Sequence, residues 1–183
     1  MGVDLSKYNN SWYDTGGSKF KVALWFIVKG IVFLNPLFPF VGFKVSVLRM
    51  FGAKVGRGVI IKPSVNIKYP WSLEIGNHVW IGEMVWIENH CKVTIGNNAC
   101  LSQGATIMTG NHNYKKTTFD LIIKSVTLED GVWIGANAIV CPGVICGSHS
   151  ILTVNSVANQ NLEPWWIYQG NPAEKIRERV MEG

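Results

Sequence analysis

The sequence predicts an all-β protein, a left-handed parallel β-helix of six-residue repeats, from three observations. An aliphatic residue recurs every six positions from Val55 onward. Glycine often follows that residue directly, and a small or β-branched residue often stands four positions after it. Each six-residue unit then makes one short strand and one turn, and three units close one triangular coil. Chains with this repeat are an exception to the right-handed crossover rule.

The six-residue step also assigns the interior of the prism. Of fourteen successive positions, thirteen hold Val, Ile or Leu and the other holds Cys146. The thirteen are Val55, Ile61, Ile67, Ile75, Ile81, Ile87, Ile95, Leu101, Ile107, Leu128, Ile134, Val140 and Leu152. We expect these side chains to fill about five stacked coils.

A length of 183 residues is typical of a single domain, and we predict one domain over residues 1–183. The β-helix occupies residues 55–162, and residues 111–124 break the six-residue step and leave the prism as an extended loop. Residues 1–54 form an N-terminal helical cap. Residues 163–183 form a C-terminal tail that contains a short helix.

Prolines and apolar runs place the helices. Apolar residues 20–34 and 40–50 predict two helices separated by Asn35-Pro36 and Pro39. We expect them to cover the open edge of the first coil. The first apolar run is shorter than the roughly 20 residues that a membrane-spanning helix needs. A third helix is expected over residues 172–181 at the other end.

Composition narrows the class of protein. Hydrophobic residues make up 48% and charged residues 16%, which argues against disorder. Lys and Arg number 17 against 12 Asp and Glu, but no basic cluster resembles a nucleic-acid-binding arm. The four cysteines lack CxxC spacing and no secretory signal precedes them, so we expect reduced thiols in the cytoplasm.

Several motifs carry a resemblance to a known family. They are T-G-N-H at 109–112, G-V-W-I-G-A at 131–136, Y-Q-G-N-P-A at 168–173, L-R-M-F-G-A-K-V-G at 48–56 and K-P-S-V-N-I-K-Y-P-W at 62–71. The chain resembles the maltose, galactoside and nodulation-type O-acetyltransferases, and most of all the colanic acid biosynthesis acetyltransferases. The resemblance implies an acyltransferase that uses acetyl-CoA.

Transfer of an acetyl group to a hydroxyl needs a base, and histidine suits this role near neutral pH. His78, His90 and His149 fall in regular turns, whereas His112 stands at the root of the long loop, at the exit of the third coil. The resemblance implies that His112 is the general base in a direct transfer within a ternary complex. Cys91 and Cys146 fall on inward positions of the repeat, which favours a buried apolar role over that of a nucleophile.

A neighbouring group should orient the imidazole of His112. The candidates are Glu83, Glu88 and Asn89 on the preceding coil, Asp120 in the loop, or a backbone carbonyl. The asparagine that galactoside-type enzymes place beside their histidine aligns with Gly82 here, so no partner can be transferred from them.

The resemblance also implies a coenzyme A site along the last coils. Trp133 packs at the acceptor or pantetheine side, Ala136 and Val154 contribute backbone contacts, and Asn159 with Arg177 lies near the adenine and phosphates. Lys175, Arg177 and Arg179 supply basic charge, and an ordinary solvated terminal helix is the alternative for each of them. The four histidines include no close pair of the kind that binds a metal, so no metal site is expected.

The predicted function is acetyl-CoA-dependent O-acetylation of a sugar hydroxyl in exopolysaccharide biosynthesis. Two alternatives remain open: N-acetylation of an amino sugar or small amine, and a non-catalytic trimeric scaffold. The acceptor is a sugar or a lipid-linked oligosaccharide. The flat faces of a prism predict a homotrimer.

Residues 20–50 contain more aromatic residues and lysines than are needed to cover one coil. They either pack on the prism and on neighbouring subunits or rest on the inner membrane, where lysines meet anionic head groups. The protein is therefore expected in the cytoplasm, with peripheral membrane contact as the second possibility.

Overall fold

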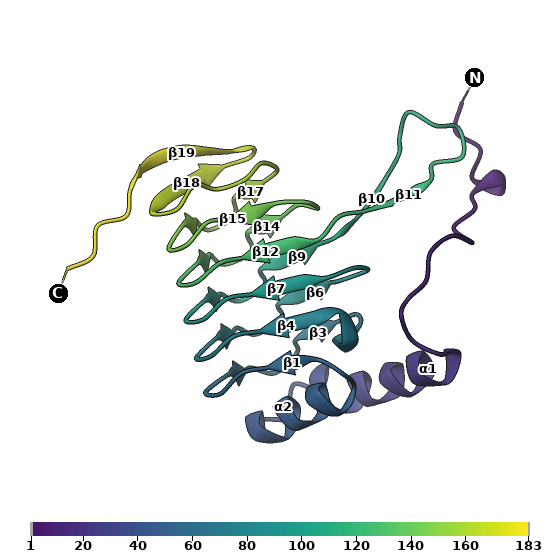
Figure 1. Cartoon of the computed structure of the whole chain (residues 1–183), viewed down its shortest axis with the longest axis horizontal. Helices are drawn as coiled ribbons and strands as arrows, with labels where there is room; N and C mark the ends of the chain where they lie inside the picture. The colour runs from purple at the N-terminus through teal and green to yellow at the C-terminus, as the bar shows by residue number, and fades with distance from the viewer. Residues whose placement is uncertain (1, 183) are drawn as a thin grey trace.

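The computed structural model describes residues 2–182, so Met1 and Gly183, the two ends of the predicted domain, lie outside the described residues. The chain forms a three-sided β-helix with helices at one end, and a hairpin leaves one corner (Figure 1). The predicted fold class is confirmed.

Three sheets form the sides of the prism. Sheet A contains β1 (Lys54–Val55), β4 (Leu73–Ile75), β7 (Val93–Ile95), β12 (Val126–Leu128) and β15 (Ile145–Cys146). Sheet B contains β2 (Ile60–Ile61), β5 (Trp80–Ile81), β8 (Cys100–Leu101), β13 (Trp133–Ile134), β16 (Ile151–Leu152), β18 (Trp166–Gly170) and β19 (Ala173–Glu178). Sheet C contains β3 (Asn66–Ile67), β6 (Trp86–Glu88), β9 (Thr106–Met108), β14 (Ile139–Val140) and β17 (Val157–Ala158).

Corresponding strands of successive coils pair in parallel, in the register that the six-residue step predicts. Ile61 pairs with Ile81, and Ile67 with Ile87. The chain completes five coils, and a sixth begins where Leu162 bridges to Cys146 and β18 joins sheet B. The interior positions are buried as expected; Val55, at the edge of the first coil, is only partly buried.

The helices at the first coil lie where the sequence places them. They are α1 (Lys19–Val28), which continues as a π-helical turn η2 (Lys29–Phe33), and α2 (Val41–Met50); η1 (Leu5–Lys7) and η3 (Pro70–Ser72) are short 3-10 turns. The buried Trp25 packs against Phe33 and Phe51, and its Nε1 donates a hydrogen bond to the carbonyl of Ile67, 3.1 Å away. This layer therefore covers the open end of the prism.

The predicted helix over residues 172–181 is wrong. This segment is the strand β19, which pairs antiparallel with β18, so that Trp166 faces Glu178. After the last coil, β18 would otherwise leave a row of unpaired N–H and C=O groups, and pairing with β19 satisfies them. That gain outweighs the weak helical propensity of a short basic and acidic segment.

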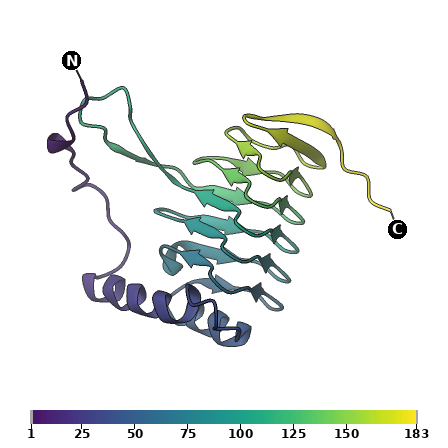
Figure 2. The same ribbon diagram turned by 180° about the vertical axis from the view of Figure 1, so that it is seen from behind.

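Residues 111–124 leave the prism as expected, but as a hairpin and not as an irregular loop. β10 (Gly110–His112) pairs antiparallel with β11 (Leu121–Ile123), and His112 faces Leu121. Figures 1 and 2 both show this hairpin projecting from the prism toward the N-terminal segment.

Candidate functional site

His112 is the last residue of β10 and contacts two aromatic rings. Its imidazole stacks on Phe119, with ring centroids 4.5 Å apart and planes 5° from parallel. The ring of Tyr8 lies against it at 5.8 Å. Stacking on Phe119 restricts the orientation of the imidazole.

A backbone carbonyl orients His112. Nδ1 lies 2.9 Å from the carbonyl oxygen of Phe119. A carbonyl oxygen only accepts, so in the neutral ring Nδ1 carries the hydrogen and Nε2 keeps a lone pair. Phe119 has a φ of 51°, in the left-handed region that a bulky residue rarely adopts. Phe119 thus has a left-handed backbone conformation in the turn before β11, and its carbonyl oxygen accepts the hydrogen bond that selects the tautomer of His112.

The side chains proposed from sequence do not make this contact. Asp120 accepts from Lys116 and Thr118 at the hairpin tip. Glu83 lies in the turn between sheets B and C, whereas the hairpin leaves the corner between sheets C and A. Glu88 and Asn89 do lie at that second corner, one coil below the hairpin.

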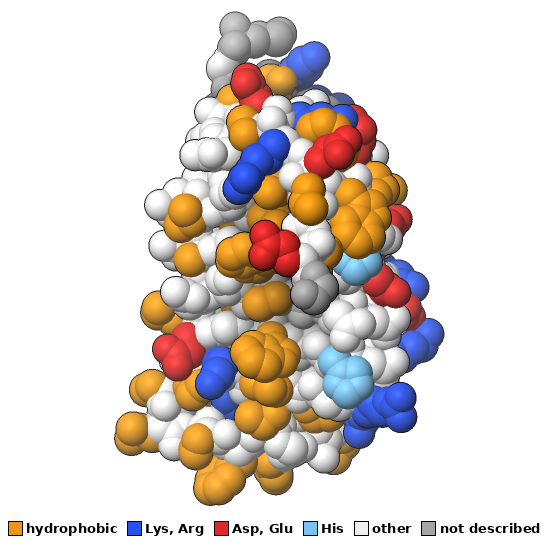
Figure 3. Space-filling view, turned by 90° about the vertical axis from the view of Figure 1, so that its left-hand side faces the viewer, with side chains coloured by type: hydrophobic (Ala, Val, Ile, Leu, Met, Phe, Trp, Pro, Cys, Tyr) orange, Lys and Arg blue, Asp and Glu red, His pale blue; other side chains and the backbone are white. Residues whose placement is uncertain are grey.

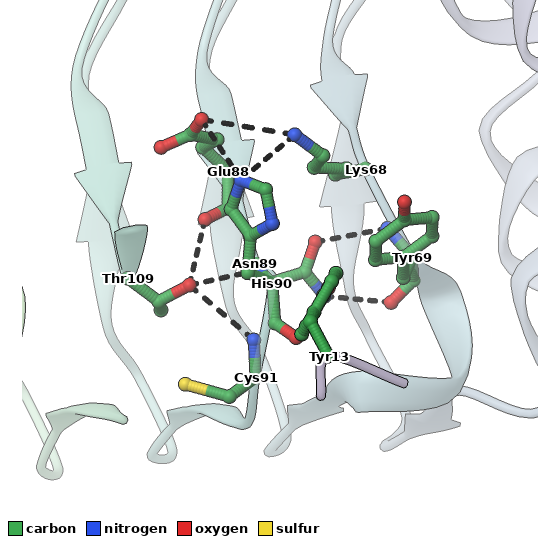
Figure 4. A network of polar contacts seen from close by, with 8 residues as sticks. All are labelled: Tyr13, Lys68, Tyr69, Glu88, Asn89, His90, Cys91 and Thr109. Atoms are coloured by element: carbon green, nitrogen blue, oxygen red, sulfur yellow. Dashed lines mark hydrogen bonds and ion pairs between the residues drawn. The ribbon is translucent and has the colours of Figure 1, made fainter. Parts of the chain in front are cut away.

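Glu88 belongs to a charged cluster at this corner (Figure 4). His90 Nε2 lies 2.8 Å from Lys68 Nζ and 3.2 Å from Glu88 Oε1. The pKa of Glu88 is lowered from its ordinary 4.5, mainly by the hydrogen bond with His90, and the charges of Lys68 and His112 add to this effect. Burial lowers the pKa of the Lys68 ammonium. Glu88 is thus a stable carboxylate near the His112 imidazole.

Asn89 holds the corner together. Its side chain is fully buried, accepts from the N–H of Tyr69 at 3.0 Å and donates to the carbonyl of Tyr69 at 2.6 Å. Thr109 Oγ1 donates to the carbonyl of Glu88 and accepts from the N–H of His90. The two coils on either side of Glu88 are therefore tied to it by side-chain hydrogen bonds (Figure 4).

An N-terminal arm, residues 2–18, reaches from the hairpin to α1. The N–H of Asp4 donates to the carbonyl of Thr117 at the hairpin tip, 2.8 Å away. Tyr8 contacts His112, and the Tyr13 hydroxyl donates to the carbonyl of His90 at 2.8 Å. No motif marks this arm in the sequence, and the only signal is the aromatic residues within a polar segment.

The residues assigned to coenzyme A lie at two corners of the prism. Trp133, on sheet B, is exposed, and its Nε1 donates to Ser102 Oγ. Ala136 and Val154 lie in stacked turns between sheets B and C, where Gly135 lies against the N–H of Val154. Asn159 follows β17 at the corner between sheets C and A, which is the corner that carries the hairpin. One chain therefore does not bring these residues into one groove.

The basic residues of the tail lie on β19. Lys175 Nζ donates to Glu163 Oε2 at 2.6 Å and sits 3.7 Å from the centroid of the Trp166 ring. Arg177 is exposed and faces Ile167 across the pair of strands. Both cations lie at the end of sheet B, beyond the last complete coil.

The other two histidines, His78 and His149, lie in turns of the coils. His78 and His149 adopt φ values of 56° and 62° in the tight turns of the coils. His149 stacks on Trp165 at 4.1 Å. Within residues 2–182 no group of three or more His, Cys, Asp or Glu side chains is placed to hold a metal ion, and none of the helices described there is long and apolar enough to span a membrane.

Known proteins share both the sequence and the fold. The colanic acid biosynthesis acetyltransferase WcaF of Escherichia coli K12 is 33% identical over 177 residues, which cover 97% of each chain. An acetyltransferase with hexapeptide repeats from Vibrio cholerae, solved with acetyl coenzyme A, superposes with a TM-score of 0.77 at 22% identity, covering 89% of this chain and 87% of that one. A galactoside acetyltransferase solved with coenzyme A gives 0.78 at 23% identity, covering 87% and 80%. No protein-family model matches. At 33% identity over nearly its full length, the chain belongs to the colanic acid biosynthesis acetyltransferases, and it is an acyltransferase.

Proposed function

We propose that this acyltransferase moves an acetyl group from acetyl-CoA to a sugar hydroxyl in exopolysaccharide biosynthesis of the colanic acid type. The acceptor is a sugar or a lipid-linked oligosaccharide. The observation that carries the proposal is His112, whose Nδ1 is held by the carbonyl of Phe119 while Nε2 keeps its lone pair. The name of the 33% identical relative supports the reaction class.

In the proposed mechanism both substrates are bound at once. His112 Nε2 takes the proton of the acceptor hydroxyl while the oxygen attacks the thioester carbonyl. Backbone N–H groups stabilise the oxyanion. The carbon–sulfur bond then breaks, coenzyme A leaves, and the proton passes from His112 to its sulfur. No acetyl-enzyme forms, and burial raises the pKa of the Cys146 thiol, so that it remains an inert interior side chain.

We assign Glu88 and Asn89 supporting roles. The Glu88 carboxylate stabilises the positive charge that His112 gains when it accepts the proton. Asn89 keeps that carboxylate in place by binding the backbone of Tyr69 on the preceding coil. Neither residue touches the imidazole through a hydrogen bond, so each acts on the reaction through the position or the charge state of His112.

The coenzyme A groove is proposed to form between two chains of a homotrimer. Asn159 shares the hairpin corner, whereas Trp133, Ala136 and Val154 face another side of the prism. Two chains side by side bring the two sets together, with Lys175 and Arg177 at the phosphate end. Two of the solved structures with this fold contain coenzyme A or acetyl-CoA, which supports the co-substrate.

We place the reaction in the cytoplasm. All four cysteines are free thiols, which suits a reducing compartment. An acceptor attached to a lipid carrier would be modified where the cytoplasm meets the inner membrane.

The test follows free thiol release from acetyl-CoA with galactosyl and fucosyl acceptors, and with amino sugars at equal concentration. We expect release with a sugar alcohol, and His112→Ala should lower kcat by about 10²–10⁴-fold while binding to immobilised coenzyme A persists. His78→Ala, in a turn of the coil, is the control. Faster turnover of amino sugars would assign N-acetylation instead. Absence of both turnover and coenzyme A binding would favour a scaffold.

A further inference from the structure

The charges of this chain are strongly segregated along the sequence. Residues 15–73 contain no Asp or Glu and nine basic residues, namely Lys19, Lys21, Lys29, Lys44, Arg49, Lys54, Arg57, Lys62 and Lys68. The other residues hold eight basic and twelve acidic side chains. Residues 15–73 comprise α1, η2, α2 and the first coil, so the positive charge gathers at one end of the prism. We call the exposed side of this segment the basal surface.

The basal surface is also apolar. α1, η2 and α2 bury one side, including Trp25 and Phe33, against the first coil. These helices and the segment that joins η2 to α2 expose ten large hydrophobic residues, namely Phe20, Leu24, Phe26, Ile27, Ile31, Leu34, Leu37, Phe40, Phe43 and Met50. Figure 3 shows hydrophobic side chains gathered at the lower end of the molecule, where the helices lie in Figure 1. A helix that is apolar all round is typically buried or in contact with lipid.

Two of the cations lie close to aromatic rings of this segment. Lys29 Nζ lies 5.7 Å from the centroid of the Phe26 ring, and Lys21 Nζ lies 4.6 Å from that of Trp71. Lys19, Arg57 and Lys62 are exposed. Aromatic and aliphatic groups flanked by lysines are the composition of proteins that lie in the interface of a membrane.

The absence of acidic residues decides between lipid and a second copy of the chain. Lys44 is buried, and Lys54 and Lys68 are paired with Glu74 and Glu88. If two basal surfaces met, the exposed cations Lys19, Arg57 and Lys62 of one would face those of the other, and residues 15–73 supply no carboxylate to pair with them. Anionic lipid head groups complement this charge, and the acyl region accepts the exposed Phe and Leu side chains.

We propose that the basal surface binds the surface of an anionic phospholipid bilayer, with the helices lying in the interface and the prism axis directed away from it. The purpose of this binding rests on the proposed function: it would bring the enzyme to a lipid-linked acceptor. The binding itself does not depend on that function. The N-terminal arm runs from the basal end to the hairpin with His112 (Figures 1 and 2), so a bilayer-anchored acceptor would reach the site along this side of the prism.

The test measures co-sedimentation of the full chain with vesicles of phosphatidylcholine, with and without phosphatidylglycerol. We expect binding only to the anionic vesicles, and weaker binding when NaCl is raised from about 0.1 M to about 0.5 M. Lys19→Gln should weaken binding about fivefold, and the double variant Phe20→Glu/Phe26→Glu at least about tenfold.

Matched variants at the opposite end provide the controls. Val180 and Met181 are as exposed as the two phenylalanines, and Val180→Glu/Met181→Glu should bind like the wild type. Lys115→Gln, at the hairpin tip, controls for loss of one charge. Circular dichroism checks that each variant is folded.

Three outcomes would overturn the proposal. The first is a folded wild-type chain that does not sediment with anionic vesicles. The second is binding that the basal and control variants lose equally. Dissociation of an oligomer by Phe20→Glu/Phe26→Glu would overturn it as well, because the basal surface would then be an interface between copies. Because the assay contains neither acetyl-CoA nor acceptor, its result is independent of whether the chain acetylates a sugar.

Discussion

At the scale of single residues, the site combines a positioned imidazole with a charged cluster one coil below. Phe119 makes two contacts with His112: its carbonyl oxygen accepts a hydrogen bond from Nδ1, and its ring stacks on the imidazole. Glu88 contributes a carboxylate whose side chain is only 17% exposed. A largely buried carboxylate that is hydrogen-bonded to His90 and lies near the Lys68 ammonium is stable in its charged form, and its pKa is lowered accordingly.

Glu88→Gln should change how the stability of the fold depends on pH. The folded-state pKa of Glu88 lies below its ordinary 4.5, so the carboxylate stabilises the fold above that value and ceases to do so as pH falls through the folded pKa. We expect the variant to lose about 1 kcal/mol at neutral pH, a value reduced for partial exposure, and to match the wild type more closely near pH 3. Urea unfolding at several pH values measures this.

Glu74→Gln is the matched control for that measurement. The pKa of Glu74 is also lowered, by Lys54 and Lys92, but this group lies at the surface. Salt at about 0.5 M should therefore remove most of its effect and spare that of Glu88. If the two variants respond equally to salt, the cluster around Glu88 is no more protected than a surface ion pair.

At the scale of elements, close stacking of the coils requires glycine in the turns. A Cβ on Gly82 would lie 2.7 Å from the backbone nitrogen of Gln103 and 2.9 Å from the carbonyl oxygen of Leu101. These are backbone atoms of the next coil and cannot move aside.

Gly82→Ala should destabilise the protein by about 1–3 kcal/mol, because the coils must separate to accept a methyl group. Gly42→Ala is the paired control, since a Cβ there meets nothing within 4 Å. It lies in α2, and alanine should stabilise that helix by up to about 1 kcal/mol. Thermal unfolding followed by circular dichroism compares the two variants. Equal shifts in Tm would show that stacking of the turns does not set the requirement for glycine.

At the scale of the whole molecule, outward-facing aromatic side chains lie on two sides of the prism. Trp80 and Trp133 are exposed on sheet B, and Trp86 is exposed on sheet C. Large exposed aromatic groups on flat β surfaces are typical of interfaces. This arrangement suits subunits whose flat sides meet, as the proposed trimer requires.

Sedimentation should give three times the chain mass of 20.4 kDa. Trp80→Glu introduces a charge on the flat side of sheet B, so we expect it to yield a folded monomer without transferase activity, because the proposed groove needs two chains. Met181→Glu, near the C-terminus, should leave the trimer intact. A wild-type monomer that retains full activity would contradict both the trimer and the shared groove.

The sequence by itself determined the prism, its register and the place of His112. Every interior residue, from Ile61 to Leu152, occupies an equivalent position in its coil, so one short pattern is repeated many times and can be recognised without distant contacts. The place of His112 at the root of the hairpin could be predicted because the break in that pattern marks where the chain leaves the prism, whereas its role as a base was implied by the family resemblance.

Only the tertiary structure decided what surrounds His112. Its partner is a carbonyl presented by a phenylalanine in a left-handed conformation, which no local preference of Phe predicts. Tyr13 contacts His90 from 77 residues away, and the tail becomes a strand because the edge of sheet B needs a partner. These features depend on which surfaces meet once the coils have stacked. A six-residue pattern carries no information about these tertiary contacts, because they involve segments outside the repeat.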